Sequence, residues 1–117
     1  MPKKILTAEG RDALAAVRAG DPARPDLATA VRYLLQLLAE KAPGGSVEVR
    51  VPPFGAVQVI EGPRHTRGTP PNVVEMAPET WIAVATGEEH WMDAASAGRI
   101  VASGVRSDVS DLLPLRP

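Results

Sequence analysis

The spacing of apolar residues changes once in the first half of the chain, and this change most constrains the fold. Between residues 27 and 38 apolar side chains recur at intervals of three and four, which gives one apolar stripe along a helix. Pro43-Gly44-Gly45 ends that helix. Residues 46–51 then alternate between apolar and polar, as a strand with one buried face does. The two periods together predict an α+β domain.

The other elements follow from the same periods and from their turn residues. A first helix is expected over 7–19, and Asp26 is the expected N-cap of the helix 27–41. The turn 52–55 predicts a hairpin with a returning strand at 56–61. Later we expect a strand at 73–76, helices at 77–86 and 89–97, a strand at 99–104, a short helix ending at 113 and a frayed tail. This predicts a single domain over 1–117, in which an additional N-terminal helix and linker (1–25) precede a core (26–115).

Charge and cysteine content argue against several classes of function. The chain has 13 basic and 14 acidic residues, so it lacks the excess positive charge of a nucleic-acid surface or a polybasic membrane anchor. It has no cysteine, which excludes disulfides, thiolate metal sites and a thiol nucleophile. No apolar run approaches the ~20 residues needed to cross a bilayer, and none follows the N-terminal lysines as in a secretory signal. We therefore expect a cytoplasmic protein without integral membrane association and without a nucleic-acid partner.

The residues that could act in catalysis or bind a metal do not have the sequence spacing that such sites need. His65 and His90 are the two histidines, and neither belongs to an HxH or HExxH pattern. No Gly-x-Ser-x-Gly elbow is present, and Gly44-Gly45 is not followed by the Lys-Ser/Thr of a phosphate-binding loop. We expect no metal, no cofactor and no catalytic residue. An enzyme that uses His65 is kept as a third alternative.

The second half of the chain carries a more specific pattern. Thr86-Gly87 ends one helix, Gly98-Arg99 follows the next, and a strand then ends at Gly104 before a closing helix. Together with the preceding helix and hairpin, this order over about 26–115 resembles the sterol-carrier-protein-2 (SCP2) superfamily, in particular its short bacterial branch. The resemblance implies a curved, mainly antiparallel sheet with helices packed on one face and an apolar tunnel between them. It also implies non-catalytic binding of a lipid, fatty acyl or sterol-like ligand.

Two sets of side chains form the candidate ligand site. Two arginines in one loop, Arg64 and Arg67, would meet an acidic head group, because a guanidinium pairs well with carboxylate or phosphate. The alternative is a solvated loop whose arginines pair with Glu61 and Glu75. The apolar part of the site would be lined by large or branched side chains of the sheet and later helices, namely Val49, Phe54, Val57, Trp81, Trp91 and Met92. Core packing is the alternative for each of these.

Two functions of different classes follow. The first is reversible binding of a small apolar or amphipathic ligand in a groove between the sheet and the helices. The second is a protein-interaction or accessory subunit whose groove is filled by its own side chains and which docks through the 62–72 loop. A tunnel of several hundred Å³ would favour the first function. A filled interior with an exposed apolar patch elsewhere would favour the second.

Overall fold

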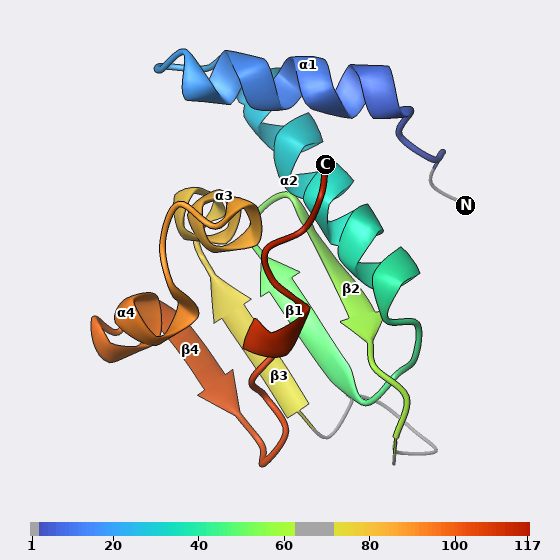
Figure 1. Ribbon diagram of the computed structural model, residues 1–117, viewed down its shortest axis with the longest axis vertical. Coiled ribbons are helices and arrows are strands. Elements are labelled where there is room, and N and C mark those ends of the chain that lie inside the picture. Colours follow the sequence, from blue (N-terminus) through green and yellow to red (C-terminus); the bar gives the residue numbers. More distant parts are fainter. Residues whose placement is uncertain (1–2, 63–71) are drawn as a thin grey trace.

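The computed structural model describes residues 3–62 and 72–117, which form an α+β fold (Figure 1). None of the helices in these two ranges is long and apolar enough to cross a membrane. In chain order the elements are α1 (Thr7–Arg18), α2 (Arg24–Lys41), β1 (Val47–Val51), β2 (Gly55–Val59), β3 (Asn72–Met76), α3 (Pro78–Thr86), α4 (Trp91–Ser96), β4 (Ile100–Ser103) and the 3-10 helix η1 (Ser110–Leu112).

The four strands form one open mixed sheet in the order β2-β1-β3-β4. β1 pairs antiparallel with β2, placing Val49 opposite Val57, and β3 pairs antiparallel with β4, placing Glu75 opposite Val101. The central pair, β1 with β3, is parallel, and here Val49 lies beside Val74. Two of the three pairings are therefore antiparallel, which confirms the predicted mainly antiparallel sheet.

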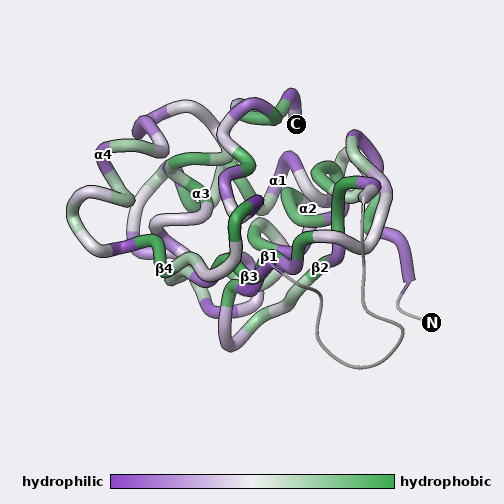
Figure 2. Tube along the Cα trace, turned by 90° about the horizontal axis from the view of Figure 1, so that it is seen from below, coloured by the Kyte–Doolittle hydropathy of each residue, from purple (hydrophilic) through white to green (hydrophobic). Residues whose placement is uncertain are grey.

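One face of the sheet is covered and the other is open. In β1, the side chains of Val47, Val49 and Val51 are fully buried, whereas Glu48 and Arg50 on the opposite face form an ion pair with each other. This is the alternation expected of a strand between a core and solvent. Figure 2 shows the helices and the C-terminal segment on the same side of the sheet. The predicted packing of helices on one face is confirmed.

The space between helices and sheet is filled by side chains. The stripe of α2 contributes Leu34, Leu35 and Leu38, each at most 2% exposed. From α3 comes Trp81, which is 0% exposed and donates its indole Nε1–H to the main-chain oxygen of Val31 at 3.2 Å. The aliphatic stripe predicted from sequence is therefore the centre of the core.

The helix α1 and the residues before it lie against α2 (Figure 1). The main-chain N–H of Ile5 donates to Gln36 Oε1, and Gln36 Nε2 donates back to the Ile5 carbonyl, both at 2.9 Å. Lys4 also pairs with Glu40 at 3.0 Å. These contacts fix the start of the segment, and buried residues of α1 continue the packing toward its end.

The start of α2 differs from the sequence prediction. The helix begins at Arg24 instead of Leu27, and Ala23 instead of Asp26 is its N-cap residue. The reason is Pro25, whose fixed φ and missing N–H suit the first turn of a helix. Asp26 then lies inside the first turn, where a carboxylate is favourable near the positive end of the helix dipole.

Candidate functional site

The residues predicted to line an internal groove are mostly part of the packed core. Val49 and Trp81 are 0% exposed and face other core side chains. Phe54 is 8% exposed, and the guanidinium carbon of Arg24 lies 5.0 Å from the centre of its ring. Val57 is partly buried against the same core. Since side chains occupy the space between the sheet and the helices, the candidate sites are grooves on the surface of the protein.

Trp91 and Met92 are the two predicted residues that the structure brings together in one groove. This groove, the α4 groove, has a volume of about 390 Å³ and lies between the end of α3, the start of α4 and the C-terminal segment. Trp91 is 8% exposed, whereas Met92 is 66% exposed. Its lining is mainly apolar and consists of Val84, Gly87, Glu89, His90, Trp91, Met92, Ser110, Leu113 and Pro114.

The walls of the α4 groove are held by main-chain geometry. The helix α3 ends at Gly87, whose φ of +84° lies in the left-handed region that favours glycine. A β-carbon at this position would lie 3.2 Å from Pro114 Cβ, so glycine also allows the C-terminal segment to approach. The Leu115 N–H then donates to the Ala85 carbonyl at 2.8 Å. The Thr86-Gly87 pair noted in the sequence thus shapes one wall of the groove.

The charge at the rim of the α4 groove is neutralised within the protein. Both terminal nitrogens of the Arg99 guanidinium donate to the two carboxylate oxygens of Glu89. This hydrogen-bonded pair lowers the pKa of Glu89 from its ordinary value of 4.5 and raises the pKa of Arg99. Because Glu89 is already paired, its charge does not need to be neutralised by a ligand, and the groove presents a mainly apolar surface.

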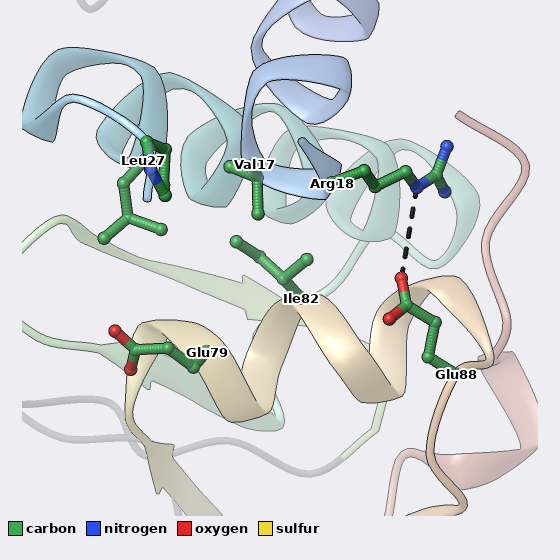
Figure 3. A pocket seen from close by; sticks show the side chains of 7 residues that line it. Val17, Arg18, Leu27, Glu79, Ile82 and Glu88 are labelled. Atoms are coloured by element: carbon green, nitrogen blue, oxygen red, sulfur yellow. Dashed lines mark ion pairs between the residues drawn. The ribbon is translucent and has the colours of Figure 1, made fainter. Parts of the chain in front are cut away.

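A second groove, the α1–α3 groove, has a volume of about 510 Å³. Figure 3 shows Val17 of α1 and Ile82 of α3 pointing toward one another, with Leu27 of α2 beside them. At one end Arg18 and Glu88 form an ion pair at 3.9 Å. The apolar centre of this groove is therefore bordered by charges and depends on α1 for one wall.

A third groove, of about 570 Å³, lies between η1 and the end of β2. Its lining includes Ile60, which has a φ of +67°, a conformation that is unusual for a β-branched residue. The residue is held there because its N–H donates to the Ala42 carbonyl at 2.7 Å and its carbonyl accepts from the Ser46 hydroxyl at 2.8 Å. The predicted strand 56–61 consequently ends at Val59.

Part of the predicted site lies outside the residues that the structure describes. Arg64, His65 and Arg67 lie outside the described residues, as does most of the 62–72 loop. Within residues 3–62 and 72–117, no group of three or more histidine, aspartate or glutamate side chains is arranged to hold a metal ion. His90 lies at the α4 groove beside Glu89.

Sequence reasoning missed the contribution of the C-terminal segment to the α4 groove. The tail 114–117 is predicted to fray, yet its Leu115 is 6% exposed and belongs to the core, as does Val109 before it at 1% exposed. Leu113 and Pro114 thereby come to line the groove opposite Trp91. A signal was present in the sequence, since Val109, Leu112, Leu113 and Leu115 give this stretch several apolar side chains to bury.

Comparison with known proteins identifies the family. No curated protein gives a significant match. The family described as bacterial SCP ortholog matches residues 23–115, which extend from the start of α2 to the buried Leu115 and leave α1 outside. The four-stranded mixed sheet with helices on one face agrees with an SCP2-like fold. The chain belongs to the family of bacterial SCP orthologs.

Proposed function

We propose that this protein reversibly binds a small apolar or amphipathic ligand, such as a fatty acyl or other lipid chain, without changing it chemically. Its membership in an SCP-like family supports a lipid-binding carrier role. The observation that carries the proposal is the placement of Met92, largely exposed, beside Trp91 in the apolar α4 groove. Methionine next to tryptophan suits an adaptable apolar site.

The α4 groove lies within the part of the chain that matches the family, and this favours it over the α1–α3 groove. All residues that line the α4 groove fall between 84 and 114, inside the matched range 23–115. The α1–α3 groove takes Val17, Arg18 and Pro22 from the part of the chain before that range. A role common to the family is therefore better supported by the α4 groove.

The size and lining of the α4 groove limit the class of ligand. Its volume of about 390 Å³ lies toward the lower end of the ~300–1,000 Å³ of small-molecule sites. It therefore suits a small ligand or one end of a longer chain. Binding would be driven by burial of apolar surface at ~25 cal/mol per Å², reduced by the cost of association. An acidic head group would remain outside this apolar surface, and Arg64 and Arg67 are the proposed contacts for it.

Native mass spectrometry of the protein purified from its own host, followed by organic extraction, is the direct test. A stoichiometric lipid or acyl species would support the proposal. Titration with decanoic acid, followed by tryptophan fluorescence, then measures binding to the emptied protein. A bare mass together with no uptake of decanoic acid would rule out the carrier function.

Met92→Glu tests the location of the site. It places a carboxylate in the apolar groove, and it is compatible with folding because residue 92 is exposed and lies in the first turn of α4. We expect decanoic acid binding to fall by about tenfold or more, because the ligand would lie against an unpaired charge. Val105→Glu is the matched control, since Val105 is 99% exposed and does not line the groove. Equal affinity of the two variants would place the site elsewhere.

The second candidate function is that of a protein-interaction or accessory subunit that docks through the 62–72 loop. Two observations favour it: the interior between sheet and helices is filled, and Met92, Val101 and Val105 leave apolar surface exposed. If the protein carries no ligand and takes up none, cross-linking in its own host followed by mass spectrometry should identify a partner. Cross-links confined to the 62–72 loop would support this function.

A further inference from the structure

Two arginines of α2 converge on Phe54, at the turn between β1 and β2. The Nε–H of Arg32 donates to the main-chain oxygen of Phe54 at 2.7 Å. The guanidinium carbon of Arg24 lies 5.0 Å from the centre of the Phe54 ring, within the range of a cation–π contact. The Phe54 ring is itself anchored, because it belongs to the core and is only 8% exposed. One residue therefore positions both guanidinium groups.

The positive charges of Arg24 and Arg32 are not neutralised within the described parts of the chain. Neither guanidinium has a carboxylate within 4.0 Å there, whereas Lys4, Arg18 and Arg99 each have one. Arg32 uses its Nε–H for Phe54, so its terminal nitrogens keep their donors. Both arginines are exposed to solvent. The pair thus presents two positive charges and several free donors in fixed positions.

The start of α2 carries charges of both signs, because Asp26 lies in its first turn. Arg24 is the first residue of an 18-residue helix whose N-cap, Ala23, makes no side-chain cap hydrogen bond. The N-terminus of such a helix carries a partial charge of roughly +0.5, and the Asp26 carboxylate in its first turn offsets it, so the two arginines supply the attraction for an anion. Arg32 lies about 12 Å further along the axis, but helical side chains lean toward the N-terminus, and its contact with Phe54 shows that it reaches back to this end.

We propose that Arg24 and Arg32, both held against Phe54, form a binding site for a phosphate group. The planar guanidinium group can donate two parallel hydrogen bonds to two phosphate oxygens, a geometry that the point charge of a lysine does not offer. Two arginine charges complement a phosphate monoester, which carries about −1.5 to −2 at neutral pH, better than they complement a single carboxylate. The site is separate from the α4 groove and does not depend on the ligand proposed there.

The phosphate has two possible sources, a free phosphorylated molecule or the head group of an anionic lipid. Titration of the full chain with inorganic pyrophosphate, followed by amide NMR spectra, tests the first source. Co-sedimentation with phosphatidylcholine vesicles that contain phosphatidic acid, compared with pure phosphatidylcholine vesicles, tests the second. Pyrophosphate shifts at the amides of Arg24, Asp26, Phe54 and Gly55 would support the site with a free ligand, and selective sedimentation would support it with a lipid head group.

Arg24→Gln and Arg32→Gln are the test variants. Because each removes a charge-assisted contact, we expect the affinity to fall about tenfold in the assay that shows binding. Arg11→Gln is the control with the same change of charge, since Arg11 is exposed on α1 and its Nε–H donates to the Pro117 carbonyl. Arg24→Lys keeps the charge but not the fork, and we expect an intermediate loss. It also serves as the second variant if Arg32→Gln disturbs the turn. Failure of both ligands to bind, or an equal loss in Arg11→Gln, would overturn the proposal.

Discussion

Gly10 of α1 lies directly against the ring of Tyr33 in α2. A β-carbon at residue 10 would lie 2.3 Å from Tyr33 Cγ, which is far inside van der Waals contact. Tyr33 cannot easily yield, because it is 2% exposed and part of the core. The close approach of α1 to α2 therefore requires glycine at this position.

Gly10→Ala should destabilise the protein although alanine is the better helix former. Helix propensity alone would contribute a gain of about 1 kcal/mol, whereas forcing a methyl group against a packed ring costs about 1–3 kcal/mol. We expect the free energy of unfolding to fall by up to about 2 kcal/mol, which is the difference between these two contributions. Urea denaturation measures this change, and hydrogen exchange should show faster exchange in α1 than in the sheet.

The combination of Gly10→Ala with Tyr33→Leu is the control for this explanation. A smaller side chain at residue 33 leaves room for the methyl group, so the two changes should cost less together than the sum of their separate costs. Additive costs, or a Gly10→Ala variant more stable than the wild type, would contradict the contact as the cause.

Trp81→Phe tests the link between α3 and α2. The substitution removes the indole donor of the 3.2 Å hydrogen bond to Val31 and leaves a void at a fully buried position. We expect the free energy of unfolding to fall by about 1–3 kcal/mol, as measured by urea denaturation. Trp91→Phe should cost less, because Trp91 retains 8% exposure at the α4 groove whereas Trp81 is 0% exposed. An equal or larger cost for Trp91→Phe would mean that the hydrogen bond contributes little.

Most elements of the fold could be predicted because they depend on local patterns. The apolar stripe of α2 and the alternation of β1 are visible in single segments, and α3 over Pro78–Thr86 agrees closely with its predicted range. The parallel pairing of β1 with β3 is different, because it depends on how distant segments assemble. Ile60 also could not be predicted, since its left-handed conformation is imposed by hydrogen bonds to Ala42 and Ser46.

Less of the candidate site could be predicted than of the fold. Trp91 and Met92 are neighbours in sequence, so their joint presence in one groove needed no knowledge of the assembly. Val49 and Trp81 show the limit of such reasoning. A periodic pattern indicates which side chains face inward, but whether the space they face is filled depends on packing between distant elements. Phe54 is predicted from sequence as apolar lining, whereas in the structure it packs in the core and contacts Arg24 and Arg32.

The ion pair of Glu89 and Arg99 should make stability depend on pH in the acid range. The hydrogen bonds from Arg99 hold the pKa of Glu89 below 4.5 in the folded protein. A group with a lowered folded pKa stabilises the protein above its unfolded pKa, and this stabilisation is lost as the pH falls through the folded pKa. The pKa of Arg99 is raised, so its contribution remains constant over the same range.

Glu89→Gln should therefore lower the Tm at neutral pH, and the difference from the wild type should disappear as the pH falls below 4.5 and through the folded pKa of Glu89. The pair is exposed to solvent, so added salt should also reduce the difference at neutral pH. Glu88→Gln is the matched control, because Glu88 faces Arg18 at the longer distance of 3.9 Å and should show a smaller effect. Thermal unfolding of both variants across a series of pH values measures the difference. If the Glu89→Gln difference stays constant from neutral to acid pH, the ionised carboxylate is not its source, and the side chain acts through packing alone.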